Sequence, residues 1–147
     1  MEKFWSSVIP LTLVSEILTF ISTRILDTSP LMTAISMGTV LFYSVCLTGL
    51  GVGIGAMYPK FNADNPAEIA VSWGGILYMM LGVFYIGATL VIEAVPLRMF
   101  YMHRIFPHYR AENALIAAAV VIFLALQAVT LYLPLRMGVK ALEEMEL

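Results

Sequence analysis

The side chains that could do chemistry in this chain are a few polar residues set inside long apolar runs. Glu16, Glu93 and Gln127 have mostly apolar neighbours, and Arg24 lies near the end of an apolar run. In an apolar setting a carboxylate can bind a proton or a cation, a guanidinium can pair with a carboxylate, and an amide can form hydrogen bonds between helices. Which of these roles applies depends on whether the runs cross a membrane.

The composition indicates that the bilayer is the solvent of this chain. Hydrophobic residues make up 61% and charged residues 12% of the 147 residues, whereas soluble domains contain about 45–50% apolar and about 25% charged residues. The formal net charge of -2 argues against nucleic acid as a partner, because binding phosphates requires a basic surface. We therefore expect membrane lipid around the chain.

Four apolar runs are long enough to cross a bilayer, which takes about 20 residues per helix. They cover about residues 4–26, 31–57, 69–95 and 113–133. Between the first two runs, Asp27-Thr28-Ser29-Pro30 suits a tight turn, because the polar residues can cap a helix and Pro30 fixes φ at its start. The sequence therefore predicts an all-α fold, an integral membrane bundle of four transmembrane helices that forms a single domain over residues 1–147.

Glu16 is expected near the bilayer centre. It lies about 12 residues into the first span, which is roughly 18 Å at 1.5 Å per residue. A carboxylate at this depth is costly and usually faces a bundle interior or a wet cavity. Two interpretations stay open: the carboxyl group forms hydrogen bonds to a neighbouring helix, or it takes part in proton-coupled transport.

Arg24 and Glu93 are predicted to lie at similar depth, because each is near the same end of its span. An ion pair between them would reduce the cost of both charges in the membrane. Arg24 could instead extend to the lipid headgroups. For Gln127 in the fourth span we expect a hydrogen bond between helices, which contributes about 0.6 kcal/mol on average in membrane proteins.

Alternating glycines in the second span predict a packing face. They are Gly49, Gly51, Gly53 and Gly55. Alternate members stand four residues apart on one helix face, and small residues at this spacing let membrane helices approach closely. The run also matches a dinucleotide-binding pattern, but no strand precedes it. We therefore expect no cofactor here, and the scattered His103, His108 and Cys46 do not have the spacing of a metal site.

The segment from Tyr58 to Glu68 carries polar residues in an ordered arrangement. Asn65 can cap a helix, Pro66 suits its first position, and Glu68 can reach back to the cap. A helix is therefore expected to start here and continue into the third span. The rest of the loop contributes Pro59, Lys60, Phe61 and Asp64. The loop is either a turn between membrane helices or a surface that docks a partner.

The glycine run and this loop resemble a known family. The likeness rests on Gly49-Leu50-Gly51-Val52-Gly53-Ile54-Gly55-Ala56-Met57-Tyr58-Pro59-Lys60-Phe61, then Asp64-Asn65-Pro66-Ala67, then Gly74-Gly75-Ile76-Leu77-Tyr78-Met79. In this order the stretches resemble the C-terminal part of ABC transporter permeases, of the type-2 (exporter) class of ATP-binding cassette systems. The resemblance extends from about Phe4 to Arg136 and is strongest between Leu47 and Met80.

The resemblance implies a membrane-spanning permease component that is not itself an enzyme. A separate ATP-binding cassette ATPase subunit would hydrolyse ATP, and other permease helices or a second permease copy would complete the pathway. Permeases of this class usually have more spans, so the chain is expected to be the C-terminal part of a longer or split permease. The expected location is the plasma or inner membrane of the cell, as a multi-pass protein.

The resemblance also decides the expected orientation. Basic residues are shared equally between the two sides of the predicted bundle: Lys3, Lys60, Arg136 and Lys140 on one side, and Arg24, Arg98, Arg104 and Arg110 on the other. In the family the loop after the glycine-rich helix is cytoplasmic, which implies that both termini are cytoplasmic. The basic residues that closely follow the fourth span agree with this orientation.

Two other functions remain compatible with the sequence. One is a small proton-coupled four-helix exporter, in which Glu16 binds substrate and proton alternately. The other is a non-transporting membrane assembly subunit. The ordered polar loop has no role in the first of these. An ATPase gene beside this one would favour the ATP-driven permease over both.

Overall fold

The computed structural model describes residues 2–59, 66–105 and 113–145, and these ranges are helical apart from short turns. Within them the helices are α1 (Glu2–Ile25), α2 (Pro30–Met57), α3 (Pro66–Ala70), α4 (Trp73–Ile105) and α5 (Asn113–Met145). None of the described residues forms a strand. In the same ranges four helices, all except the short α3, are long and apolar enough to cross a membrane. The predicted all-α fold with four spans is confirmed.

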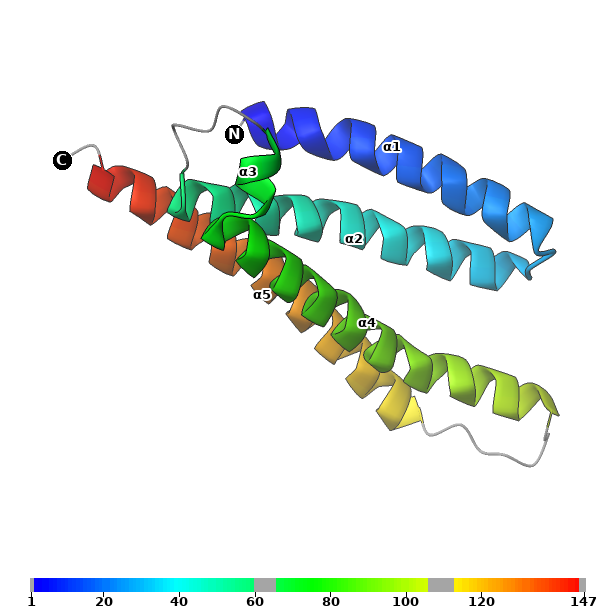
Figure 1. Cartoon of the computed structure of the whole chain (residues 1–147). Coiled ribbons are helices and arrows are strands. Elements are labelled where there is room, and N and C mark those ends of the chain that lie inside the picture. Colours follow the sequence, from blue (N-terminus) through cyan, green and yellow to red (C-terminus); the bar gives the residue numbers. More distant parts are fainter. Residues whose placement is uncertain (1, 60–65, 106–112, 146–147) are drawn as a thin grey trace.

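α2 is the central helix of the described structure, as Figure 1 shows. It contacts α1 on one side and α4 and α5 on the other, and α4 and α5 also contact each other. Among the described helices α1 contacts α2 alone. In the most apolar stretch of α2, 33% of the residues are buried, compared with 6% in the corresponding stretch of α1. The fold is therefore a three-helix unit of α2, α4 and α5, to which α1 is attached through α2.

The outer faces of the helices expose large apolar side chains. Val83 and Phe84 on α4 are 73% and 74% exposed, and Val121 on α5 is 65% exposed. In water such a surface would be an aggregation site, whereas in a bilayer it is the surface that contacts lipid. The beginning of α1 and the end of α5 lie at the same end of the structure as α3, and the turn between α1 and α2 lies at the opposite end (Figure 1).

The turn between α1 and α2 is built as the sequence predicts. The Ser29 side chain accepts a hydrogen bond from the backbone N–H of Met32 at 3.4 Å, and Pro30 occupies the start of α2. α1 ends with backbone bonds from Thr28 N–H to the Thr23 carbonyl and from Asp27 N–H to the Arg24 carbonyl. Asp27 has a φ of 48°, the left-handed conformation that this helix ending requires. The expected tight hairpin is confirmed.

The helix expected to start at Pro66 does not continue into the third span. α3 ends at Ala70, and α4 begins at Trp73. The Ser72 side chain interrupts the helix, because its hydroxyl donates to the Ile69 carbonyl at 2.6 Å and accepts from the Gly75 N–H at 3.2 Å. Ser72 thus caps α4, as serine commonly does before a first helical turn. The long helix therefore starts after Ser72, and not at Pro66 as predicted.

The last two spans are longer than expected. α4 and α5 contain 33 residues each and end at Ile105 and Met145, well beyond the predicted limits. At 1.5 Å per residue each measures about 50 Å, which exceeds the roughly 30 Å of hydrocarbon. Both helices continue through an internal proline, Pro96 in α4 and Pro134 in α5. The apolar pattern marks where a helix is within lipid, and does not mark where the helix ends.

Candidate intramembrane polar site

A cluster of polar side chains lies where α2, α4 and α5 meet, within the parts of these helices that are long and apolar enough to cross a membrane. We call it the polar cluster, and its members are Thr39, Tyr43 and Cys46 on α2, Tyr85, Thr89 and Glu93 on α4, and Gln127 on α5. On α2 and on α4 the members follow one another at intervals of three or four residues. Such intervals place side chains on one face of a helix. Both faces are turned toward the interior of the three-helix unit.

Thr39 and Glu93 form one end of the polar cluster. The Thr39 hydroxyl donates a hydrogen bond to Glu93 Oε1, which joins α2 to α4. Thr39 is buried and Glu93 is half-buried. A buried polar group without a partner costs free energy, and this bond reduces the cost for both side chains.

Gln127 forms the other end and holds the three helices together. Its Oε1 accepts from the Tyr85 hydroxyl on α4 and, at 3.3 Å, from the Cys46 thiol on α2. The thiol also lies 3.6 Å from the Gln127 backbone carbonyl. All three residues are buried. This geometry agrees with the expectation that Gln127 forms a hydrogen bond to another helix. Its two side-chain partners come from α2 and α4.

Two polar atoms within the polar cluster have no hydrogen-bond partner in the described part of the chain. They are Gln127 Nε2 and the Tyr43 hydroxyl, and both are buried. The Tyr43 ring stands edge-on to the Tyr85 ring, with centroids 5.7 Å apart. The Thr89 hydroxyl donates to the Tyr85 backbone carbonyl at 2.8 Å. The middle of the polar cluster is therefore held by ring packing, and it retains unused capacity for hydrogen bonds.

Glu16 lies on α1, away from the polar cluster. Both of its carboxylate oxygens are buried and have no hydrogen-bond partner among the described residues. The same holds for the hydroxyl of Thr12, which is four residues earlier and on the same face of α1. Because α2 is the helix that α1 contacts in the described structure, these atoms are covered at the α1–α2 interface. Glu16 is thus half-buried, and within the described residues its carboxylate lacks the hydrogen bond to a neighbouring helix that one interpretation expected.

Arg24 and Glu93 do not form the expected ion pair in the described structure. The Arg24 guanidinium lies over the Phe20 ring, 5.0 Å from its centroid. Glu93 is on α4, and α2 lies between α1 and α4 (Figure 1). Similar depth therefore does not bring the two side chains together, and Thr39 on α2 is the hydrogen-bond partner of Glu93.

The four glycines of α2 have different surroundings. A Cβ at Gly49 would lie 2.6 Å from the Leu131 side chain, and a Cβ at Gly53 would collide with the Pro134 backbone, so both face α5. Gly51 faces Tyr78 of α4, where a Cβ would lie 3.3 Å from the ring. At Gly55 a Cβ would have no atom of the described residues within 4 Å. Close approach of α2 to α5 therefore depends on Gly49 and Gly53, and Gly55 is not part of this contact.

Most of the loop that was considered as a docking surface falls outside the described residues. This applies to Lys60, Phe61, Asp64 and Asn65. Pro59 is half-buried at the end of the described segment, and Pro66 is the first residue of α3. Glu68 lies in the first turn of α3 and is exposed. The expected cap by Asn65 stays a prediction.

The comparisons with known proteins give one match. A family model described as "Putative ATP-binding cassette" matches residues 1–147. The chain belongs to this ATP-binding cassette family. No curated protein and no solved structure matches it. In this family member the match covers the four helices that are long and apolar enough to cross a membrane, because these helices make up nearly all of the described chain.

Sequence reasoning missed five members of the polar cluster in this ATP-binding cassette family member. They are Thr39, Tyr43, Cys46, Tyr85 and Thr89. Each lies inside an apolar run, and none carries a formal charge. The usable signal is their spacing, which gives each of the two helices a polar face. Such a face is improbable on a helix that only contacts lipid.

Proposed function

We propose that the chain is a membrane-spanning permease component of an ATP-binding cassette exporter, energised by a separate ATPase. The observation that supports this most directly is the extent of the family match. It covers a chain in which the described residues are almost entirely membrane-spanning helix. In a cassette system a part of this kind supplies the path through the membrane.

The packing suggests how such a component would work. α2, α4 and α5 are joined by the polar cluster and by the close contact at Gly53, so they move as one unit. α1 is attached through α2 alone in the described structure. Because α2 is the one described helix that α1 contacts, a change at the α1–α2 interface, which contains Glu16 and Thr12, would disturb no other pair of described helices. We assign substrate passage to this interface and coupling with the ATPase to the end that carries α3.

This proposal places α3 and both termini in the cytoplasm of a cell with the protein in its plasma or inner membrane. The loop between α2 and α3 then lies on the side of the ATPase, and Lys60 and Asp64 are its charged candidates for contact. Other permease helices or a second copy complete the pathway. The exposed outer face of α1 is the available surface for them.

Reconstitution with the ATPase tests the proposal. The tagged chain is purified together with the ATPase that associates with it, and both are placed in proteoliposomes. We expect ATP hydrolysis to require the ATPase and to rise when the permease is present. An ATPase variant that binds but cannot hydrolyse ATP is the control. Hydrolysis by the chain alone, or an ATPase rate that is indifferent to the permease, would contradict the proposal.

A second candidate function is proton-coupled export, and the surroundings of Glu16 favour it. Its two buried oxygens have no partner in the described part of the chain, and an intramembrane carboxylate in such a position can bind a proton or a cationic substrate. The energy source separates the two functions. Transport that follows an imposed pH gradient in the absence of ATP would support the second and exclude the first.

A further inference from the structure

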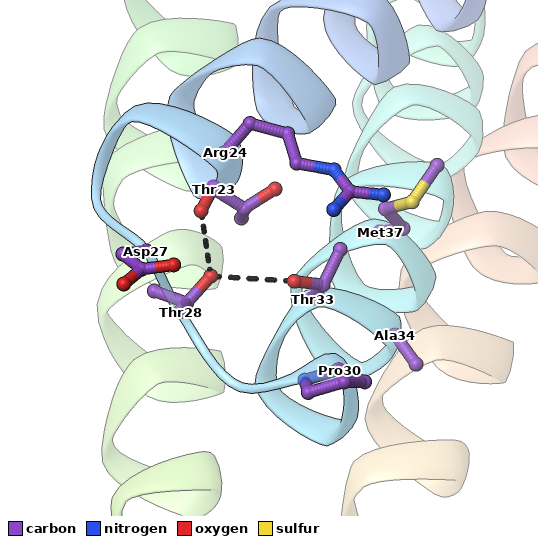
Figure 2. Close-up of a pocket in the computed structure, with 8 residues that line it drawn as sticks. All are labelled: Thr23, Arg24, Asp27, Thr28, Pro30, Thr33, Ala34 and Met37. Carbon is purple, nitrogen blue, oxygen red and sulfur yellow. Dashed lines mark hydrogen bonds between the residues drawn. The ribbon is translucent and has the colours of Figure 1, made fainter.

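A pocket lies at the end of the structure opposite α3, between the last turn of α1 and the first turns of α2. Its volume is about 270 Å³, and the residues that matter here are Arg24, Asp27, Thr28, Thr33 and Met37 (Figure 2). The candidate span Phe4–Ile25 has 22 residues. At 1.5 Å per residue it measures about 33 Å, close to the roughly 30 Å of hydrocarbon. The pocket therefore lies at the level where lipid chains meet their headgroups.

The wall of this pocket is held by hydrogen bonds within the turn. The Thr28 hydroxyl donates to the Thr23 carbonyl at 2.9 Å and lies 3.2 Å from the Thr33 hydroxyl (Figure 2). The Thr33 hydroxyl also reaches the Ser29 carbonyl at 3.3 Å. These hydroxyls are engaged with the protein, so they fix the shape of the pocket. The charged side chains are left to recognise a ligand.

Two opposite charges line the pocket without pairing. Within the described part of the chain Arg24 makes no hydrogen bond or ion pair through its guanidinium, which reaches across toward Met37 of α2, whereas Asp27 lies on the other side of the pocket (Figure 2). The guanidinium packs on Phe20, which leaves its N–H groups available. A guanidinium binds phosphate through a planar pair of donors, and a carboxylate accepts from an ammonium group. The arrangement matches a ligand that carries both charges.

We propose that this hairpin pocket binds the headgroup of a zwitterionic phospholipid with a primary amine, such as phosphatidylethanolamine. Arg24 holds the phosphate and Asp27 accepts from the ammonium group. The position of the pocket at the level of the lipid headgroups favours a lipid over a free anion. The exposed side chains of Leu31 and Ile35 on the first turns of α2 offer the acyl chains an apolar path. Bound in this way, the lipid fastens α1 to α2 at the end that carries the turn between them.

Lipid retention by the full chain, purified in detergent, tests the proposal. Native mass spectrometry measures binding of phosphatidylethanolamine, phosphatidylcholine and phosphatidylglycerol added at equal concentration. We expect phosphatidylethanolamine to bind about tenfold more tightly than the other two, because only its headgroup can donate hydrogen bonds from a cation to Asp27. Equal binding of the three lipids would overturn the proposal.

Variants separate the two charges. Arg24→Gln should weaken binding of all three lipids about tenfold, because each carries a phosphate. Asp27→Asn should remove only the preference for phosphatidylethanolamine, and asparagine tolerates the left-handed backbone at this position. Arg98→Gln is the matched control, since Arg98 is an exposed arginine of α4 and no part of the pocket. An equal loss in Arg24→Gln and Arg98→Gln would mean that the lipids respond to net charge alone, which contradicts the assignment.

Two further measurements keep the result interpretable. Inorganic phosphate at the same concentration should not displace the bound lipid, and displacement would show a site for free anions instead. Thermal unfolding without added lipid should be the same for Arg24→Gln and the wild type. If Arg24→Gln does not fold, Arg24→Lys replaces it, because lysine keeps the charge but loses the paired donors. An unchanged affinity in that variant would overturn the role given to Arg24.

Discussion

Thr39 on α2 donates a hydrogen bond to the Glu93 carboxylate on α4, 54 residues later in the chain. This contact joins two of the long apolar helices, and Thr39 is buried there. It also explains why Glu93 does not need Arg24. The three helices are thus joined at both ends of the polar cluster. One end has the Thr39–Glu93 hydrogen bond, and the other has the hydrogen bond between Tyr85 and Gln127.

Thr39→Val is expected to destabilise the fold by about 1 kcal/mol, more than the average hydrogen bond between membrane helices, because it leaves the Glu93 carboxyl group without its partner. The matched control is Thr48→Val on the same helix. Among the described residues the Thr48 hydroxyl bonds only to the Ser44 carbonyl of its own helix, at 2.7 Å, so its loss should cost less. Unfolding of the purified chain in detergent measures both variants.

The double variant Thr39→Val with Glu93→Leu refines this test. Replacing both partners by apolar side chains removes the unsatisfied group, so part of the lost stability should return. Additive losses in the double variant would show that the two side chains do not interact. Equal losses in Thr39→Val and Thr48→Val would lead to the same conclusion.

Two tyrosines of the polar cluster should respond oppositely to the loss of a hydroxyl. Tyr85→Phe removes the donor to Gln127 and is expected to cost about 1 kcal/mol. Tyr43→Phe removes a buried hydroxyl that has no partner among the described residues, so stability should stay the same or rise. Both changes keep the ring contact between the two residues. A larger loss in Tyr43→Phe than in Tyr85→Phe would show that the hydrogen bonds are assigned to the wrong ring.

The fold could be predicted from the sequence because the apolar runs are long and the first turn is well marked. Asp27 to Pro30 gave the hairpin, and residue counts gave the four spans. The break at Ser72 was missed, since a single serine after a predicted cap gives little local signal. The ends of α4 and α5 were missed for another reason. A proline ended each apolar run, whereas in a long helix the neighbouring turns tolerate it.

The polar site could be predicted only in part. Gln127 was identified as a contact between helices, because an amide in an apolar run needs a partner. The pairing of Arg24 with Glu93 was wrong, because depth along a span does not say which helices are neighbours. That depends on packing, and the close contact of α2 with α5 at Gly53 sets the order of the helices. Side-chain chemistry gives candidates, and helix order decides which of them meet.

Gly53→Ala is expected to be the more damaging of two glycine substitutions on α2. Its new Cβ would collide with the backbone of Pro134, and a backbone cannot move aside as a side chain can. We expect a loss of about 1–3 kcal/mol, as for other overpacked sites. Gly55→Ala is the control, since no described residue lies close to a Cβ at that position and alanine favours a helix. Similar stability of the two variants would contradict close packing of α2 on α5.

The proposed orientation can be measured by cysteine labelling of intact cells. In a Cys46→Ala background, a cysteine at Asp27 should react with an impermeant reagent from outside, and a cysteine at Glu143 should react only after the membrane is opened. Both positions are exposed, so access to the reagent depends on their side of the membrane. A cysteine at Asn62 should behave like the one at Glu143. The opposite pattern would place the α1–α2 turn in the cytoplasm and remove the loop from contact with an ATPase.

Glu16→Gln separates the two candidate functions. Glutamine keeps the size and the capacity for hydrogen bonds but cannot ionise. If ATP drives transport, ATP hydrolysis by the reconstituted complex should stay within about twofold of the wild type, as expected for a change that removes little stability. Glu143→Gln, at an exposed position near the end of α5, is the control for loss of a carboxylate. A pH-sensitive dye enclosed in the proteoliposomes reports proton flow at the same time. Proton flow through the wild type that disappears in Glu16→Gln and persists in Glu143→Gln, at equal membrane abundance, would contradict the ATP-driven permease. It would make Glu16 the proton-binding group of an exporter that needs no ATPase.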